Sequence, residues 1–382
     1  MEDGKPTILW MSNSPLAPTG YGVVTKNVCL RLKRLGWPVS ILAFWGLEGS
    51  AIQVGGVTVY PKRFTIFGED AARLVISHNR PDIFITLFDV WVGADWLPAL
   101  HPRWLAYTPV DHKPLPPLVF EALERCYKPI AMSKFGLREM EEAGIKAEYI
   151  PHGVDTKIFK PMDKAECREA LIPKHKDHFV VGINAANKGE RKDFPRMFAA
   201  FRRFLDDNPD AKALLYVNAF PIFPEGLDLC ALAKSFGLEK NCVFVNEYKK
   251  YVGISDEGMA RWYNACDVFM NLARGEGFCL PLIEAQACGV PAIATDFSSM
   301  TELVEGHGWL VPPESWNLTP LMAFQAIASA EKAAEALGEA YSKTSLLEKY
   351  SKASREFALG YDWDEAILPL WDALLKREAE KI

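Results

Sequence analysis

The chain has 382 residues, more than one hydrophobic core usually serves, because cores stop growing at about 250–300 residues. We therefore expect two domains. Hydrophobic residues make up 49% and charged residues 24%, which excludes a disordered or collagen-like chain. The formal net charge of −6 lacks the basic excess that neutralises phosphates, so a nucleic-acid partner is excluded as well.

The cysteines and the N-terminus favour a cytoplasmic protein. Eight cysteines show no paired short spacing, which is typical of reduced thiols. The first apolar run, Thr7–Met11, is too short for a signal sequence or a membrane span. Arg31, Lys33 and Arg34 could touch anionic lipid, but charges on one helix are usually a solvated face. We expect at most peripheral membrane contact.

The N-terminal part alternates short β-rich runs with helical periodicity, a pattern that predicts an α/β domain with a parallel sheet. A helix is expected over Val23–Leu35, closed by Gly36. The expected strands are Thr7–Met11, Val39–Trp45, Ile83–Leu87, Trp104–Val110, Pro129–Met132 and Glu148–Ile150.

The C-terminal part repeats this pattern. The expected strands are Phe179–Ile183, Ala213–Val217, Val243–Val245, Val268–Asn271 and Ala292–Thr295. The intervening segment Lys157–His178 is rich in Lys, Pro and Asp and is expected to be the linker, which gives domains over 1–165 and 166–362. A final helix within 363–382 has a broad apolar stripe and must dock on another element, the first domain being one option.

The loop after Asn271 is the most informative segment. Pro281 suits the first turn of a helix and Gly289 its C-terminal cap, so a helix N-terminus follows this strand end. Its amides near residues 278–280 suit hydroxyls or an anion, and Gly277 permits close approach.

Two carboxylates flank this loop. Glu276 lies on its lip and Glu284 in the first turns of the following helix. A carboxylate can accept two neighbouring hydroxyls, as a ribose or sugar diol offers. Each glutamate alone has an ordinary explanation, since Glu284 could complement the helix dipole and Glu276 could be solvated. Their shared placement favours a polyhydroxylated ligand.

A second strand end carries cations. Arg191 and Lys192 precede a helix, where two positive charges are unfavourable by a few tenths to about 1 kcal/mol each unless an anion is bound. The pattern indicates a diphosphate, with exposed basic residues as the alternative.

These motifs resemble those of the retaining GT-B glycosyltransferases of glycosyltransferase family 4. The segment Gly275-Glu276-Gly-Phe-Cys-Leu-Pro-Leu-Ile-Glu284 is similar to their Glu-x7-Glu signature. Ile150-Pro-His-Gly-Val-Asp155 resembles their interdomain turn, and Tyr263-Asn-Ala-Cys-Asp-Val-Phe-Met270 resembles their entry into the next strand. The resemblance implies two Rossmann-like, doubly wound domains facing across a cleft.

The resemblance also implies roles for the second-domain residues. Glu284 would hold the ribose of a nucleotide sugar and Glu276 the hydroxyls of the donor sugar. Lys192 matches the lysine that grips the diphosphate, whereas the arginine position could be filled by Arg191, with Asn184 or Asn187 standing near it. The donor would also contact the residues at the helix N-terminus, which are Gly277, Phe278, Cys279 and Leu280.

In the first domain, Gly20 and Gly22 lie in a loop before a helix and could donate amides to the donor phosphates, or could simply turn the chain. The family has His-Asp at a strand end beside the donor sugar. This chain has the order Asp111-His112, so either residue could take that catalytic position.

Two further motifs have structural explanations. Asp362-Trp-Asp364 has the form of a metal-binding Asp-x-Asp motif, but its place ahead of the final helix favours an N-cap. Ser299-Met-Thr-Glu302 reads as a capping box. No metal site or cofactor is therefore expected.

The resemblance implies a metal-independent transferase that moves a hexose from a nucleoside diphosphate sugar, with retention of configuration, to an unidentified acceptor. GDP-mannose, UDP-glucose and UDP-N-acetylglucosamine are all candidate donors. Two alternatives are a nucleotide-sugar 2-epimerase of the same architecture and a non-catalytic nucleotide- or sugar-binding protein.

Overall fold

The computed structural model describes residues 4–382, which form two compact units. The first unit contains residues 4–153, 319–323 and 362–382, and the second contains residues 154–318 and 324–361. Apart from the short segment 319–323, the chain passes between the units at Gly153, twelve residues before the expected boundary at 165, and again at Asp362. Each unit is built on a parallel sheet, as the sequence predicts.

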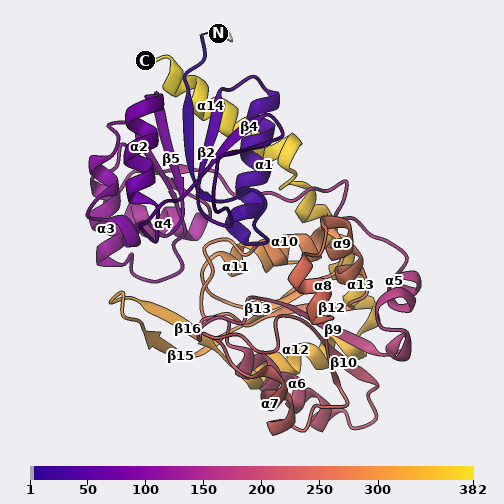
Figure 1. Cartoon of the computed structure of the whole chain (residues 1–382). Helices are drawn as coiled ribbons and strands as arrows, with labels where there is room; N and C mark the ends of the chain where they lie inside the picture. The colour runs from indigo at the N-terminus through magenta and orange to yellow at the C-terminus, as the bar shows by residue number, and fades with distance from the viewer. Residues whose placement is uncertain (1–3) are drawn as a thin grey trace. The chain divides into compact units, whose positions relative to one another are not determined.

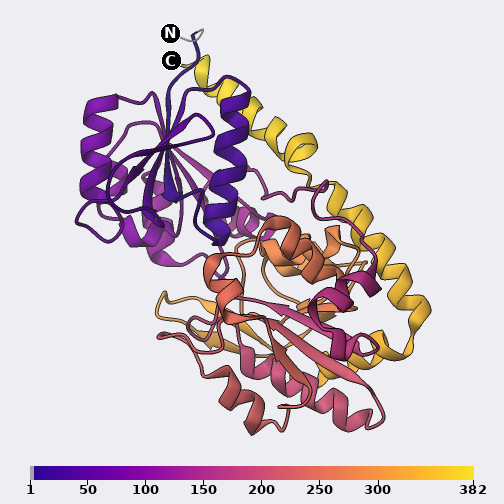
Figure 2. The same cartoon turned by 45° about the vertical axis from the view of Figure 1, so that its right-hand side comes forward.

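The first unit has an eight-stranded sheet in the order β3-β4-β2-β1-β5-β6-β7-β8, with helices on both sides (Figures 1 and 2). Its strands are β1 (Ile8–Asn13), β2 (Val39–Trp45), β3 (Ile52–Val54), β4 (Val57–Pro61), β5 (Ile83–Leu87), β6 (Trp104–Thr108), β7 (Lys128–Ala131) and β8 (Glu148–Tyr149). Its helices are α1 (Gly20–Arg34), α2 (Glu69–Asn79), α3 (Pro117–Glu124) and α4 (Lys134–Glu142). Among the strands described for this unit over residues 4–153, only β3 pairs antiparallel, in a hairpin with β4 that the sequence patterns did not predict.

The last helix, α14 (Leu368–Ala379), packs against α1 of the first unit (Figure 1). Its anchor is Trp371, which is fully buried and makes edge contacts with the rings of Trp10 and Tyr107 at 5.3 and 5.1 Å between centroids. The preceding turn is capped by Asp362, whose carboxylate accepts the amides of Asp364 and Glu365. The N-cap prediction for Asp362 is thus confirmed.

The prediction of a solvated basic face on α1 is wrong for Arg31. Its guanidinium is buried and donates to Asp364 at 2.9 Å, and Arg34 reaches the same carboxylate at 3.3 Å. The two charges therefore help to hold the C-terminal segment on α1, a contact between positions more than 300 residues apart that helical periodicity cannot reveal.

The second unit has a six-stranded parallel sheet in the order β11-β10-β9-β12-β13-β14. Its strands are β9 (Phe179–Asn184), β10 (Ala213–Asn218), β11 (Cys242–Phe244), β12 (Val268–Asn271), β13 (Ala292–Thr295) and β14 (Trp309–Val311). An antiparallel hairpin, β15 (Pro313–Leu318) and β16 (Phe324–Ala328), follows. The helices are α5 (Lys164–Leu171), α6 (Phe194–Asp207), α7 (Leu229–Ser235), α8 (Glu247–Val252), α9 (Asp256–Asn264), α10 (Leu280–Ala287), α11 (Ser299–Val304), α12 (Ala330–Ser342) and α13 (Thr344–Leu359).

The segment Lys157–His178, expected to be a linker, contains α5 and belongs to the second unit. Asp267 explains its attachment, because that carboxylate accepts from Arg168 at 2.6 Å, from Lys164 at 2.7 Å and from the amide of Val180 at 2.7 Å. The charged composition of the segment thus reflects ion pairs with the start of β12.

Candidate functional site

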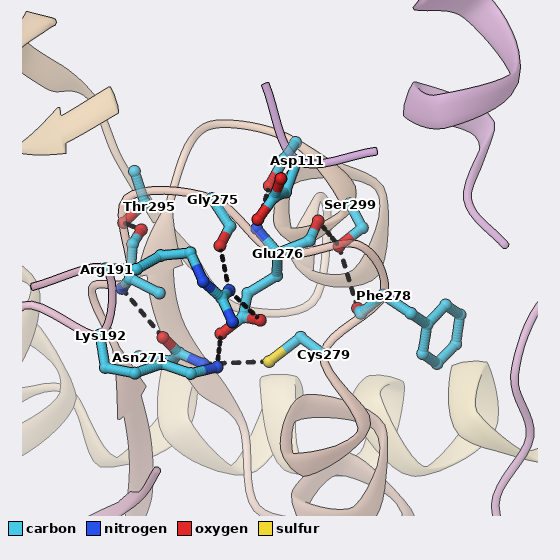
Figure 3. A network of polar contacts seen from close by, with 12 residues as sticks. Asp111, Arg191, Lys192, Asn271, Gly275, Glu276, Phe278, Cys279, Thr295 and Ser299 are labelled. Atoms are coloured by element: carbon cyan, nitrogen blue, oxygen red, sulfur yellow. Dashed lines mark hydrogen bonds and ion pairs between the residues drawn. The ribbon is translucent and has the colours of Figure 1, made fainter. Parts of the chain in front are cut away.

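The candidate site lies where two strands of the second unit end side by side. β9 and β12 are parallel neighbours, so the loops that follow them, residues 185–193 and 272–279, meet at one edge of the sheet. Figure 3 shows the side chains of Arg191 and Lys192 reaching from the first loop to Glu276 on the second. The structure thus brings Glu276 into contact with two adjacent residues that precede it by 85 and 84 positions.

Arg274 joins the two loops. Its backbone amide donates to the carbonyl of Arg191 at 2.8 Å, and its guanidinium pairs with Asp193 and Glu190 at 3.0 Å each. Because Asp193 is buried and comes directly after Lys192, these contacts fix the backbone that carries both cations. Arg274 was not predicted as a site residue, although it lies directly before Gly275 and Glu276 in the sequence.

The hydroxyl groups of Ser298 and Ser299 form hydrogen bonds with the backbone of the second loop. Ser298 accepts the amide of Glu276 at 2.9 Å, and Ser299 donates to the carbonyls of Glu276 and Phe278 at 2.9 and 3.0 Å. The predicted capping box is therefore wrong, because Ser299 is the first residue of α11 and its hydroxyl serves the neighbouring loop instead. The apolar residues that follow did form the expected helix.

Glu276 is 5% exposed and engages both cations. Arg191 Nη1 donates to its Oε2 at 2.8 Å and to the carbonyl of Gly275 at 2.6 Å, and Lys192 Nζ donates to its Oε1. Burial alone would raise the pKa of Glu276, but the charges and hydrogen bonds of Lys192 and Arg191 hold that pKa below its ordinary value. Glu276 is accordingly ionised at neutral pH.

This pairing differs from the arrangement that the sequence led us to expect. The cations were assigned to a diphosphate and Glu276 to sugar hydroxyls, whereas here the three side chains neutralise one another in part. Two positive charges and one negative charge leave the cluster with a net charge of +1. The cluster can still accept an anion beside the carboxylate, since an ammonium has three donors and a guanidinium has five.

Asn184 and Asn187, the alternatives for the arginine position, have other partners. Asn187 is buried and organises the loop after β10, donating to the carbonyl of Leu227 at 2.7 Å and accepting the amide of Leu227 at 3.0 Å. Asn184 donates to the hydroxyl of Tyr263 at 2.8 Å. Of the three, Arg191 is the side chain that contacts Glu276.

The helix N-terminus forms as predicted at α10. Pro281 lies in its first turn, and Gly289 follows its end with a φ of +76°. Gly277, Phe278, Cys279 and Leu280 make up the turn that enters this helix. Cys279 itself takes the left-handed conformation, with φ 75° and ψ 69°, and its buried thiol accepts from Asn271 Nδ2 at 3.0 Å. Burial raises the pKa of this thiol, so it stays protonated.

The left-handed backbone at Cys279 predicts an order of stability for two substitutions. Cys279→Gly should be more stable than Cys279→Ala by about 1 kcal/mol, because a Cβ in this conformation is sterically disfavoured. Both variants lose the thiol, so their difference isolates the backbone. Urea unfolding of the two proteins measures it, and equal midpoints would contradict the left-handed assignment.

Glu284 lies on α10 and has a different environment. Its Oε2 accepts a hydrogen bond from the hydroxyl of Tyr263 at 2.8 Å. Within residues 4–382, this is the side-chain hydrogen bond that the Glu284 carboxyl makes. Burial raises the pKa of Glu284 from 4.5 to about 8, against the opposing effect of the Tyr263 hydrogen bond. The two carboxyls of the signature therefore differ in charge at neutral pH.

This raised pKa predicts a pH dependence of stability. The folded chain keeps the Glu284 proton up to about pH 8, whereas an unfolded glutamate releases it near 4.5, so folding becomes less favourable as the pH rises between these values. The slope is at most about 1.4 kcal/mol per pH unit. Glu284→Gln should flatten the decline in a series of denaturation curves. An unchanged slope would show that Glu284 is ionised in the folded chain.

In the first unit, Gly22 has a steric role. A Cβ at this position would lie 2.2 Å from the carbonyl oxygen of Ala17, and the Gly22 amide donates to the N-cap hydroxyl of Thr19 at 3.1 Å. Gly20 begins α1. The Gly22 amide thus has an internal acceptor, and phosphate binding by these glycines stays a prediction.

Asp111 and His112 contact each other after the end of β6. Asp111 Oδ1 lies 2.6 Å from Nδ1 of His112, whose side chain is buried. The carboxylate therefore fixes the orientation of the imidazole, and the two candidates act as a pair. Asp89, at the end of β5, accepts from the hydroxyl of Tyr21 at 2.9 Å.

Within residues 4–382, no group of three or more His, Cys, Asp or Glu side chains is placed to hold a metal ion. The helices described over the same range include none with the length and apolar character needed to cross a bilayer.

Residues 184–327 match the family model described as glycosyl transferases group 1, which confirms the resemblance over this stretch. The chain is 34% identical over 189 residues to the lipopolysaccharide core biosynthesis mannosyltransferase LpsB of Rhizobium meliloti (strain 1021), covering 46% of this chain and 50% of that protein. It is 26% identical over 227 residues to a D-inositol 3-phosphate glycosyltransferase of Kribbella flavida, covering 57% and 48%. The chain thus spans about half the length of these relatives.

Solved structures share the fold over nearly all of this chain. A sucrose-phosphate synthase from Thermosynechococcus elongatus has a TM-score of 0.78 at 18% identity, covering 98% of this chain and all of that one. The Anabaena protein HepE in complex with UDP-glucose has a TM-score of 0.74 at 16% identity, covering 97% and 100%. The predicted α/β fold of the GT-B class is confirmed.

Proposed function

We propose that this chain, which carries a glycosyl transferases group 1 domain over residues 184–327, transfers a hexose from a nucleoside diphosphate sugar to an acceptor, with retention of configuration. The observation that carries the proposal is the cluster of Arg191, Lys192 and Glu276 at adjoining strand ends of the second unit. It joins two cations for a diphosphate with a carboxylate for sugar hydroxyls.

The proposed role of the cluster is an exchange of partners. When a donor binds, its diphosphate takes hydrogen bonds from Lys192 and Arg191, and Glu276 accepts hydroxyls of the sugar in their place. The same cations then stabilise the negative charge that grows on the diphosphate as the bond to C1 breaks. Because the loops are already joined through Arg274, this exchange needs only side-chain rotation.

In the proposed reaction, the bond between C1 of the sugar and the diphosphate oxygen breaks while an acceptor oxygen bonds to C1 on the same face. The acceptor proton passes to an oxygen of the leaving diphosphate, so the protein needs no covalent nucleophile. This route suits Glu276, because its ionised carboxylate is occupied by hydroxyls of the sugar after the exchange and therefore orients the sugar instead of attacking C1.

We propose candidate donor sugars from the names of the relatives and from the ligand of one solved structure. Their names include mannosyltransferases, and HepE was solved with UDP-glucose, so GDP-mannose and UDP-glucose come first, followed by UDP-N-acetylglucosamine. The acceptor is left unassigned, and a glycan, a protein, a lipid or a small molecule would each be compatible with the site.

A panel of nucleotide sugars tests the proposal. Transfer to an added acceptor or slow hydrolysis of one donor is the expected result. A donor returned with inverted C2 would indicate an epimerase, and calorimetric binding without turnover would indicate a binding protein; either result would contradict the proposal. Thermal-shift screening with GDP, UDP and ADP identifies the base, because a ligand at 100 times its Kd adds about 2.7 kcal/mol of stability.

We further propose that the transfer needs no divalent cation, since Lys192 and Arg191 supply the positive charge that a metal would otherwise provide. The initial rate with the preferred donor should be unchanged after dialysis against EDTA. An EDTA-treated enzyme that recovers its activity only on addition of magnesium or manganese would contradict this prediction.

A further inference from the structure

Three elements around the candidate site are linked by two consecutive, partly buried hydrogen bonds. Asn184 ends β9, Tyr263 lies near the end of α9, and Glu284 lies on α10. Asn184 Nδ2 donates to the Tyr263 hydroxyl at 2.8 Å, and this hydroxyl donates to Glu284 Oε2 at 2.8 Å. Tyr263 is therefore the residue that joins the two hydrogen bonds.

The ring of Tyr263 cannot move without repacking the core. The residue is fully buried, and its ring makes edge contacts with Trp262, Phe269 and Phe159 at centroid distances of 5.2, 5.7 and 6.2 Å. Aromatic edge contacts of this kind have preferred geometries. The hydroxyl oxygen thus occupies a fixed point between β9 and α10.

The hydroxyl also has a fixed direction. A tyrosine hydroxyl has a single proton, and the Asn184 amide occupies its acceptor side, so that proton points at Glu284 Oε2. A carboxyl group that is held at one oxygen can no longer rotate freely about its last bond. Its second oxygen, Oε1, is thereby aimed in one direction.

We propose that Tyr263, held by Asn184, is a positioning residue that orients the Glu284 carboxyl toward the ribose hydroxyls of the donor. This inference rests on the proposed function and on the ribose-binding role that the family resemblance implies for Glu284. Tyr263 would then influence how much more tightly the protein binds a ribonucleotide than the corresponding deoxyribonucleotide. A residue that served only to fill the core would affect stability and would leave that discrimination intact.

The test compares Kd values for UDP and 2′-deoxy-UDP, or for the GDP pair if guanine is the preferred base. Wild-type protein should bind the ribonucleotide more tightly. Tyr263→Phe keeps the ring but loses the hydroxyl, so ribonucleotide affinity should fall roughly tenfold, the usual effect of losing a hydrogen bond to a charged or strongly polar group. Affinity for the deoxynucleotide should change little, which brings the ratio of the two Kd values close to one.

Tyr216→Phe is the matched control. Tyr216 is also a buried tyrosine, packed against Trp262 at 5.3 Å, but the structure places it on β10 without contact to Glu284. This variant should keep the wild-type ratio of Kd values. Circular dichroism and the midpoint of unfolding show that both variants are folded.

A double-mutant cycle shows whether Tyr263 acts through Glu284. In the Glu284→Gln background, Tyr263→Phe should have no further effect on the Kd ratio. A ratio that stays at the wild-type value in Tyr263→Phe, or full additivity of the two substitutions, would overturn the inference while leaving the proposed function intact. Absence of nucleotide binding by the wild-type protein would instead remove the proposed function, and the inference with it.

Discussion

Replacing Glu276 by Gln is expected to lower the transfer rate about 10²–10³-fold, the effect of losing one preorganised polar contact to the transition state. Nucleoside diphosphate affinity should be preserved or increased in the same variant. The reason is the pairing of Glu276 with Arg191 and Lys192, since an uncharged side chain no longer competes with the phosphates for these cations. Initial rates and calorimetry with GDP and UDP measure the two effects separately.

Glu314→Gln provides the matched control, because Glu314 also pairs with an arginine of the second unit, Arg196, but lies on the partly exposed β15. Its rate and nucleotide affinity should equal those of the wild-type protein. A Glu276→Gln variant with a wild-type rate would refute the assigned role of this carboxylate. A parallel loss of rate and nucleotide affinity would show instead that Glu276 organises the loops.

Replacing Trp371 by Ala is expected to destabilise the first unit by about 3–5 kcal/mol, the cost of removing a large aromatic side chain from a packed core. The indole is fully buried against Trp10 and Tyr107, and no other residue of α14 has a side chain of that size. Hydrogen exchange should show lost protection in α1 and β1 and unchanged protection in α6 of the second unit. Chemical denaturation gives the magnitude.

Leu370→Ala is the control for this experiment, since the neighbouring Leu370 is 41% exposed on the same helix. Its effect should be within about 0.5 kcal/mol of zero, as for other surface substitutions. A uniform loss of protection in both units of the Trp371→Ala protein would mean that the units unfold together. No loss at all would contradict the anchoring role of the helix.

Most of the sheet strands could be predicted because the residue pattern within each of them is enough to favour a strand. β5 and β9, for example, are short β-rich runs with a polar loop after them, and such runs have few other structures available. The strands that were not predicted, such as β3, β4 and β15, are short or partly exposed. In the hairpin β15–β16, most residues of β15 are exposed, and this strand lacks the apolar run that marks a central strand.

The candidate site was predictable in its members but not in its contacts. Glu276, Lys192 and Arg191 were each identified by residue type next to a strand end. That they pair with one another follows from the adjacency of β9 and β12 in the sheet, and strand order cannot be deduced from local patterns. The roles of Ser298, Ser299 and Arg274 were missed for the same reason, since each serves a loop that is distant in sequence.

The route of the chain has a consequence for synthesis on the ribosome. The chain leaves the first unit at Gly153 and re-enters it at Asp362, and the two crossing segments are joined by the hydrogen bond from the amide of Val154 to the carbonyl of Tyr361 at 2.9 Å. Domains usually fold as they emerge from the ribosome. The surface of the first unit on which α14 packs therefore stays uncovered while some 200 further residues are translated. The second unit, although made later, can complete its fold first.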